Sequence, residues 1–208
     1  FIAEARPEAE PGFHAFCYPG SIPGHTFAFT GAGLVQTVNN LRLTGVEAEI
    51  PRMVLGRAVL ACPTLAAALE VLADAASGGF HFALMQRGDG RILSVEFGGG
   101  AMSRREIVAP ALHANHALHL PRGLDGQIVT ASSGDRQRRG DALVAAGAAP
   151  LAILRDTGGE GLPIRRDAED DPDEENTLGT AILRLTVRGL DWSIHDRATG
   201  PARYSGTA

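Results

Sequence analysis

The feature that most constrains the fold of this sequence is a pair of alternating apolar runs joined by a glycine-containing turn, at residues 80–97. Apolar side chains recur at every second position on both sides of the turn at 87–90: Phe80, Phe82, Leu84, Leu93, Val95 and Phe97. Side chains two positions apart share one face of a strand, and two such runs around a short turn predict a β-hairpin. A chain built on this hairpin must contain an antiparallel sheet with a buried face.

A second hairpin is expected at residues 25–43, where two β-patterned runs flank a Gly-Ala-Gly turn. On its second run, Val35, Thr37 and Asn39 share one face. The run ends in Asn39 and Asn40, although amides are uncommon inside strands. These two residues therefore indicate either a turn that ends the strand or a functional site.

The rest of the sequence forms separate blocks of strand and helix patterns. Strands are expected at 1–5 and 13–18, helices at 51–62 and 64–76, strands near 106–108 and 112–115, a helix at 133–149, and a closing hairpin at 181–194 followed by a loose tail from 199. Runs of strands kept apart from runs of helices are typical of α+β proteins with antiparallel sheets. The apolar faces then favour a layered helix–sheet–sheet–helix sandwich.

The composition is that of one globular domain, because 44% of the 208 residues are hydrophobic and 21% are charged. Seven acids lie in the run 167–175, and without them the formal charge of −5 becomes +2. We therefore expect a single domain over 1–208 with an acidic flexible loop at 165–176. The broad basic face that binds nucleic acid is not expected.

The sequence contains no apolar run long enough to span a membrane and opens with no signal peptide, so a cytoplasmic location is expected. It begins at Phe1 rather than Met, and its first residues read like the interior of a strand. We expect a processed or truncated product with residues missing upstream. A homo-oligomer is compatible with the sequence.

Residues 113–119 hold three histidines, His113, His116 and His119, around Asn115. A spacing of three residues puts successive histidines on opposite faces of a strand or spreads them around a helix, whereas zinc ligands converge on one point. A metal site is therefore disfavoured. On the expected strand at 112–115, Asn115 shares a face with His113, and its amide N–H could stabilise an oxyanion. The alternative is an asparagine satisfied by a turn.

The two cysteines, Cys17 and Cys62, allow one disulfide at most. Neither lies at a helix N-terminus or beside a cation that would lower the thiol pKa, so both are interpreted as buried core residues. Arg136, Arg138 and Arg139 occupy the first turns of the helix expected at 133–149, where the helix dipole disfavours cations. Their position indicates a role other than stabilising that helix.

Five segments occur together in an order and spacing that resemble one family: Gly33–Leu43, Pro51–Arg57, His113–His116, Ser132–Arg139 and Asn176–Thr180. The family is that of isopenicillin N acyltransferase (acyl-CoA:penicillin acyltransferase) and carcinine hydrolase-like proteins. These are N-terminal-nucleophile (Ntn) hydrolases, distantly similar to penicillin V acylase and bile salt hydrolase. The resemblance covers nearly the whole chain, and it implies an αββα fold and a precursor that cuts itself to expose an N-terminal cysteine.

The resemblance also assigns roles to individual residues. It implies that Asn115 is the oxyanion asparagine, that Asn39 is a second asparagine near the nucleophile, and that Arg136 lies beside the catalytic cysteine. The adjacent Asn40 leaves the register of the second asparagine open by one residue. Substrate contacts are expected from Asn40, His113 and His116. The family's nucleophilic cysteine is expected upstream of Phe1, on a preceding segment or a separate chain.

Two functions from different classes follow from this reading. The first is an Ntn acyltransferase or amidohydrolase that acts on a small N-acyl amide or an acyl-CoA-type thioester and needs no cofactor. The alternative is a binding or assembly module that keeps the Ntn fold without the nucleophile. A metal-dependent hydrolase built on the histidines is the third and weakest reading.

Overall fold

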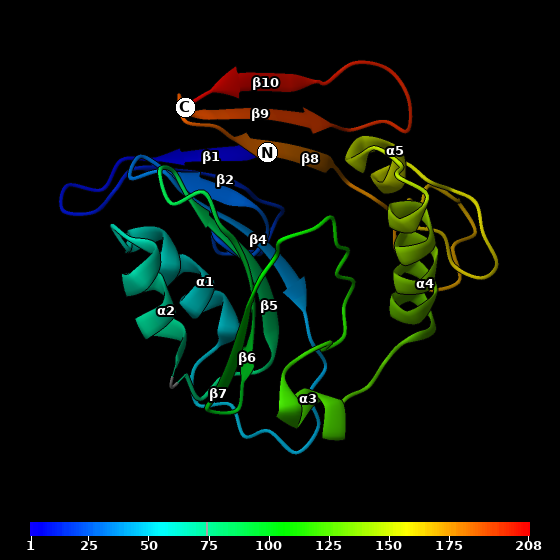
Figure 1. The fold of residues 1–208 in the computed structure, drawn as a ribbon, viewed down its shortest axis with the longest axis horizontal. Coiled ribbons are helices and arrows are strands. Elements are labelled where there is room, and N and C mark those ends of the chain that lie inside the picture. The colour runs from blue at the N-terminus through cyan, green and yellow to red at the C-terminus, as the bar shows by residue number, and fades with distance from the viewer. Residues whose placement is uncertain (74) are drawn as a thin grey trace. The chain divides into compact units, whose positions relative to one another are not determined.

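The computed structural model describes residues 1–73 and 75–208, and their contacts divide the chain into two compact units. The first unit comprises Phe1–Val108 and Asn115–Ile128, and the second comprises Ala109–Ala114 and Val129–Ala208. Figure 1 labels their helices and strands. The expected single domain over 1–208 stays a prediction.

The first unit is built on a seven-stranded antiparallel sheet in which every strand pairs with the next in the chain. Its strands are β1 (Ile2–Ala5), β2 (Phe13–Phe16), β3 (Ala28–Thr30), β4 (Leu34–Asn40), β5 (Phe80–Gln86), β6 (Ile92–Gly98) and β7 (Ala101–Glu106). Both predicted hairpins are confirmed as the pairs β3–β4 and β5–β6. The strand expected near 106–108 is instead β7, which begins directly after the Gly98–Gly100 turn and ends at Glu106.

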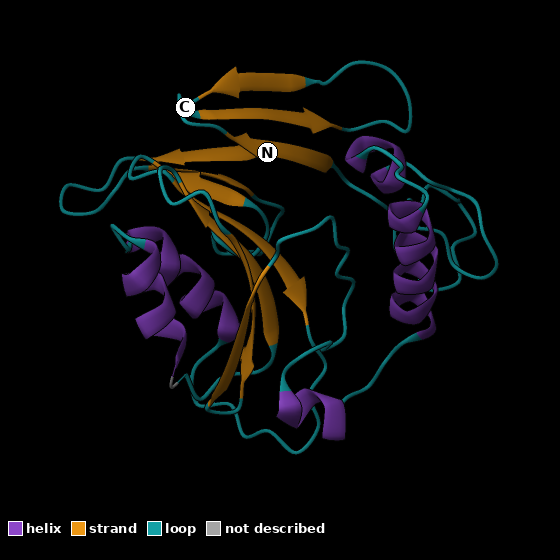
Figure 2. Ribbon diagram, viewed as in Figure 1, coloured by secondary structure: helices purple, strands orange, loops and turns teal. Residues whose placement is uncertain are grey.

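Helices α1 (Arg52–Ala61) and α2 (Leu65–Ala73) cover one face of this sheet (Figure 2). Pro51 directly precedes α1, Cys62 ends it, and the Thr64 hydroxyl accepts a hydrogen bond from the Ala67 N–H at 3.1 Å, as a helix-capping residue does. The sheet contributes three wholly buried rings to the core beneath the helices: Phe80, Phe82 and Phe97. Burying one such side chain stabilises a fold by about 1.5–3 kcal/mol, so this face is fixed by apolar packing.

The second unit combines helices with a three-stranded antiparallel sheet in the order β10-β9-β8. Its elements are α4 (Ala131–Ala145), α5 (Pro150–Leu154), β8 (Thr180–Leu185), β9 (Leu190–His195) and β10 (Tyr204–Thr207). The single helix expected at 133–149 ends early, because Gly147 takes a positive φ of 73° and α5 begins after it. The expectation of a loose tail is wrong, since β10 pairs with β9.

The strand expected at 112–115 is also absent from the structure. The backbone there bonds to side chains instead: Gln137 of α4 accepts from the Ala114 N–H at 2.8 Å and donates to the Leu112 carbonyl at 3.0 Å. Gly140 of α4 leaves room for the Leu112 side chain. With its polar groups satisfied in this way, the segment needs no neighbouring strand. The short helix α3 (Pro121–Asp125) follows in the first unit.

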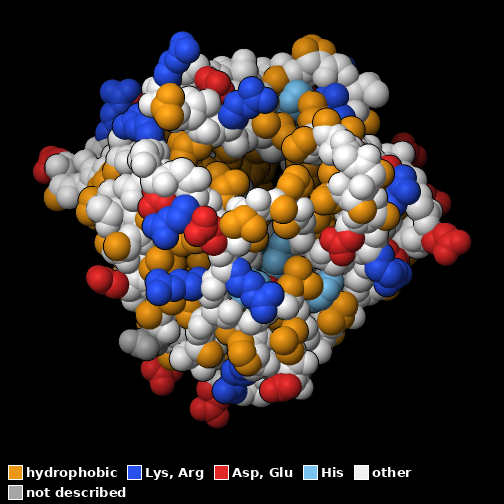
Figure 3. All heavy atoms as spheres, in the orientation of Figure 1, with side chains coloured by type: hydrophobic (Ala, Val, Ile, Leu, Met, Phe, Trp, Pro, Cys, Tyr) orange, Lys and Arg blue, Asp and Glu red, His pale blue; other side chains and the backbone are white. Residues whose placement is uncertain are grey.

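Both units pair helices with antiparallel sheets, which confirms the predicted α+β class. All 19 basic residues are arginines, and on the face drawn in Figure 3 they are interspersed with acidic side chains. Crossing a bilayer takes about 20 apolar residues in a helix, and no helix formed by the described residues meets that requirement.

Candidate functional site

A row of polar side chains crosses the face of the first unit's sheet that α1 and α2 leave uncovered. Asn39 of β4 pairs with His81 of β5, His81 with Glu96 of β6, and Glu96 with Ser103 of β7. Direct cross-strand partners point to the same face, so these four side chains form a line across four strands. His81 and Glu96 are almost fully buried, at 3% and 0% exposure.

A continuous chain of hydrogen bonds links this row to the loop that carries Asn115. The Asn39 Oδ1 lies 3.2 Å from His81 Nδ1, and His81 Nε2 lies 2.9 Å from the Ser94 hydroxyl. The same hydroxyl lies 2.9 Å from His119 Nε2, and His119 Nδ1 lies 2.8 Å from the Ser103 hydroxyl. An asparagine side chain at the end of β4 is thereby tied to a buried network.

Glu96 fixes the course of that loop through its backbone. Its two carboxylate oxygens accept hydrogen bonds from three consecutive N–H groups, those of Leu118 at 2.7 Å, His119 at 2.9 Å and Leu120 at 2.6 Å. Charge-assisted bonds of this kind are about twice as strong as neutral ones. A buried carboxylate therefore accepts the backbone hydrogen bonds that hold this turn of the loop in place.

The loop brings Asn115 to the end of β4. Its amide Nδ2 donates to the Asn40 carbonyl oxygen at 3.2 Å. Two residues further on, Ala117 exchanges hydrogen bonds with the Gln127 side chain, at 2.6 Å and 3.1 Å, which holds the loop from its other side. Asn115 and the Asn39–Asn40 pair, separated by 75 positions in the chain, thus meet within one unit.

The structure distinguishes the two adjacent asparagines. Asn39 lies on the polar face with His81, whereas Asn40 pairs with Phe80 and shares the face that packs against the helices. The Asn40 Oδ1 is buried and has no hydrogen-bond partner among the described residues. Only Asn39 shares its face of the sheet with the buried network.

The two histidines expected to bind substrate lie on different units. His113 belongs to the second unit, where its ring Nδ1 donates to the Ala114 carbonyl oxygen at 2.9 Å, and half-buried His116 belongs to the first. The expectation that His113 and Asn115 share a strand face is wrong, because no strand forms there. No three His, Cys, Asp or Glu side chains in the described ranges are arranged to hold a metal ion.

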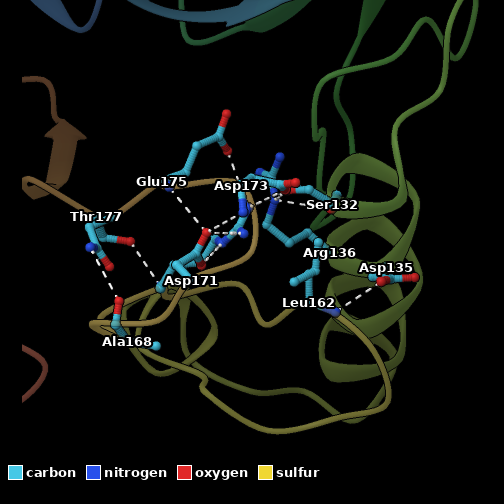
Figure 4. A network of polar contacts seen from close by, with 11 residues as sticks. Ser132, Asp135, Arg136, Leu162, Ala168, Asp171, Asp173, Glu175 and Thr177 are labelled. Atoms are coloured by element: carbon cyan, nitrogen blue, oxygen red, sulfur yellow. Dashed lines mark hydrogen bonds and ion pairs between the residues drawn. The ribbon is translucent and has the colours of Figure 1, made fainter.

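Arg136 belongs to the second unit, in the second turn of α4 (Figure 4). Thr130 caps that helix by accepting from the Ser133 N–H at 3.2 Å. The Arg136 Nε donates back to the carbonyl and hydroxyl oxygens of Ser132, at 3.1 Å and 3.2 Å. Burial lowers the pKa of Arg136 and outweighs the nearby charge of Glu175, which raises it. The guanidinium is therefore a partly desolvated cation held near the start of a helix.

The acidic run wraps around Arg166, a buried arginine of the same unit. Arg166 makes a two-pronged ion pair with Asp171 and further contacts to Asp173 at 3.1 Å and Glu175 at 3.2 Å (Figure 4). Arg166 also donates to the Ser132 hydroxyl at 3.1 Å, the group that Arg136 contacts. The run forms no helix or strand, as expected, but the side chain of Asp171 is only 5% exposed.

Both cysteines are buried, as the sequence predicts, and they form no disulfide with each other. Cys17 is 1% exposed and Cys62 is 7% exposed, and burial raises the pKa of each thiol. A raised pKa reduces the thiolate fraction at neutral pH, and the thiolate is the nucleophilic form. Neither cysteine is suited to attack a substrate.

Comparisons with known proteins bear on the family and the fold of the chain. The family model for acyl-coenzyme A:6-aminopenicillanic acid acyl-transferases matches residues 2–199. No curated protein matches the chain. Among solved structures, the chain is similar to an arginine-to-leucine variant of conjugated bile acid hydrolase from Clostridium perfringens, with a TM-score of 0.53 and 14% identity over 95% of this chain and 76% of that chain.

The structural likeness shows the fold alone, and it confirms the Ntn-hydrolase fold predicted from the sequence. The family model extends over nearly all of the 208 residues. The chain belongs to the acyl-coenzyme A:6-aminopenicillanic acid acyl-transferase family.

Proposed function

We propose that this protein is an Ntn acyltransferase or amidohydrolase that removes the acyl group from a small N-acyl amide or acyl thioester. Membership of an acyltransferase family supports the reaction class. The single observation that carries the site is the hydrogen bond from Asn115 Nδ2 to the Asn40 backbone carbonyl, which brings the Asn115 side chain to the end of β4, next to Asn39 in the chain. The name of the solved relative adds amide hydrolysis as the second chemistry to test.

We assign the nucleophile to an N-terminal cysteine that precedes Phe1 and is exposed by self-cleavage. The burial of Cys17 and Cys62, with the raised pKa of both thiols, supports this assignment because it removes the other sulfur nucleophiles from consideration. In this scheme the cysteine's own α-amine takes the thiol proton. The sulfur then attacks the acyl carbonyl carbon, and the carbonyl π electrons move to oxygen.

Asn39 and Asn115 are the proposed donors to that oxyanion. An amide N–H placed where negative charge develops stabilises the transition state more than the ground state. When the tetrahedral intermediate collapses, the C–N or thioester C–S bond breaks and the leaving group takes the proton from the α-ammonium. Water or an acceptor amine then attacks the thioester on the enzyme, which gives hydrolysis or acyl transfer.

Arg136 is proposed to stabilise the thiolate, as the arginine beside the nucleophile. Its partial burial supports this role, because a desolvated cation interacts more strongly with a nearby anion. Asn40, His113 and His116 are the proposed substrate contacts.

The test is acyl-group release by the full-length protein from two probes. One is an acyl-coenzyme A with and without 6-aminopenicillanic acid, followed by free thiol, and the other is a conjugated bile acid, followed by released amine. Asn115→Ala is expected to lower kcat by about 10²–10³, the loss that follows removal of one oxyanion donor. Asn176→Ala is the matched control, since that asparagine is exposed in the acidic loop.

The outcomes separate an enzyme from a binding module. Intact-mass analysis should find a polypeptide that starts with cysteine, and a thiol-directed electrophile should label that residue before Cys17 or Cys62. A preparation without such a polypeptide and without turnover would favour the binding or assembly module. Full turnover in Asn115→Ala would remove Asn115 from the site.

A further inference from the structure

We infer that His81 is a positioning residue that aims the Asn39 amide, through a directional relay of hydrogen bonds from His119 and Ser94. This inference rests on the proposed function, because it gives Asn39 the oxyanion role. It adds His81, Ser94 and His119, which lie outside the five segments that resemble the family. Every group in the relay belongs to the first unit.

The direction of the relay follows from which atoms can donate. The atom that faces His81 is the Asn39 Oδ1, which can only accept, so the proton must sit on His81 Nδ1. In a neutral imidazole the other nitrogen then accepts, and the Ser94 hydroxyl donates to His81 Nε2. A hydroxyl has one proton, so Ser94 must accept from His119 Nε2.

The relay keeps this direction whatever the charge of His119. Neutral His119 with its proton on Nε2 accepts from Ser103 at Nδ1, and protonated His119 donates to Ser103 instead. In both states the Nε2 proton points to Ser94. A Glu96 carboxylate oxygen also lies 3.7 Å from His119 Nε2.

The relay is rigid because both of its ends are anchored. His81 lies in the middle of the sheet and is 3% exposed, while His119 is 6% exposed and its own N–H is bound by Glu96 at 2.9 Å. A side-chain amide is planar, so fixing Oδ1 on His81 turns Nδ2 to the opposite side of the group. Asn39 is thereby held in one of the two orientations that an asparagine amide can take.

Two substitutions of His81 separate the two ring nitrogens. The Asn side chain places its amide nitrogen near the position of the His Nδ1, and the longer Gln side chain places it near the His Nε2. His81→Asn therefore retains a donor toward Asn39, whereas His81→Gln retains only the contact toward Ser94. We expect His81→Gln to lower kcat by about 10- to 100-fold with KM nearly unchanged, less than the loss of the donor itself.

His81→Asn is expected to recover most of that loss, to within about threefold of the parent enzyme. The assay is the acyl-coenzyme A thiol-release assay on the full-length protein. Equal losses in the two variants, with equal thermal midpoints, would overturn the positioning role. Asn39→Ala combined with His81→Gln should be no slower than Asn39→Ala alone, because His81 acts through Asn39. Losses that multiply in the double variant would also overturn it.

A spectroscopic measurement tests the relay without turnover. Long-range ¹H–¹⁵N correlation on ¹⁵N-histidine-labelled protein should show the proton of neutral His81 on Nδ1 and a protonated Nε2 in His119. A neutral His81 with its proton on Nε2 would overturn the relay. Loss of activity in Asn39→Ala with parent-like activity in His81→Gln would overturn this inference alone, and full activity in Asn39→Ala would overturn the oxyanion role as well.

Discussion

Glu96 is the residue on which the course of the Asn115 loop depends. Its carboxylate is wholly buried and accepts three consecutive backbone N–H groups from residues 118–120. In Glu96→Gln an amide NH₂ group replaces one of the two carboxylate oxygens. This NH₂ group can only donate, and it faces backbone N–H groups that also donate. We expect a loss of about 1–3 kcal/mol in the free energy of unfolding, the cost of a buried unsatisfied polar group.

The measurement is urea unfolding together with amide hydrogen exchange. The N–H groups of Leu118, His119 and Leu120 should lose protection in Glu96→Gln, while amides in β8 and β9 should not. Glu106→Gln is the control, since Glu106 is exposed on β7. Unchanged protection at 118–120 would show that the carboxylate does not hold the loop.

Asn39 and Asn115 are predicted as site residues from the sequence, Asn39 because an amide inside a strand is unusual and both because they lie in segments that resemble the family. The residues that support Asn39 are not predicted. Ser94 and Glu96 alternate with Leu93, Val95 and Phe97 in a strand pattern that is normally read as a solvated face. That face is buried by a loop whose path depends on Glu96 itself, and single-sequence periodicity carries no information about such a partner.

At the scale of elements, the glycines within helices have opposite roles. In α1 a Cβ on Gly56 would fall well inside contact distance of the Gly24 carbonyl oxygen, and Gln36, which is wholly buried, donates to the carbonyls of both glycines at 2.9 Å and 3.3 Å. In α4 a Cβ on Gly134 would meet only the end of Arg138, at 3.4 Å, and Val129 at 3.9 Å. Helix propensity therefore determines how an alanine at position 134 changes the stability, whereas packing determines it at position 56.

Gly134→Ala is expected to stabilise the protein by about 0.5–1 kcal/mol, the difference in helix propensity between Gly and Ala. Gly56→Ala gains the same propensity but forces backbone apart, so we expect a net loss of about 1–3 kcal/mol. Thermal and urea unfolding of the two variants side by side is the measurement. Stabilisation by both substitutions would show that α1 can move away from Gly24 without cost.

Local signals were sufficient for elements that satisfy their own hydrogen bonds. Both hairpins, α1 with its stop at Cys62, and the Thr64 cap of α2 were predicted from periodicity and from residues with defined turn or cap chemistry. The segment at 112–115 was misassigned because its backbone bonds to Gln137, a side chain more than twenty positions away. The pairing of β10 with β9 was missed because an exposed strand of polar and small residues has no apolar alternation.

At the scale of the whole molecule, the two units differ in what stabilises them. The first unit has a core of buried phenylalanine and aliphatic side chains beneath α1 and α2. The second unit contains several ion pairs of arginine, among them Arg166 with Asp171 and Arg139 with Asp156. The only tryptophan, Trp192, lies on β9 in the second unit, so its fluorescence reports on that unit.

Acid should therefore destabilise the second unit through its aspartates. Burial raises the pKa of Asp171, but hydrogen bonds from Arg166 and from the N–H groups of Glu175 and Asp173 outweigh it and hold the pKa below its ordinary value. A carboxyl whose folded pKa is lowered stabilises the fold above its unfolded pKa of about 3.9, and this contribution is lost as pH falls through the folded pKa. Trp192 fluorescence should show urea midpoints that fall steeply below about pH 4.

Asp171→Asn should lower the urea midpoint at pH 7, because Arg166 then remains buried without its main partner, and should flatten the fall in midpoint below about pH 4. Asp170→Asn, a change at an exposed neighbour in the same run, is the control and should keep the parental pH dependence. Each variant removes one negative charge from the acidic run. A difference in stability between the two variants therefore reports on the Arg166 ion pair rather than on the net charge of the run. An equally steep fall in Asp171→Asn would mean that other carboxylates dominate acid unfolding of this unit.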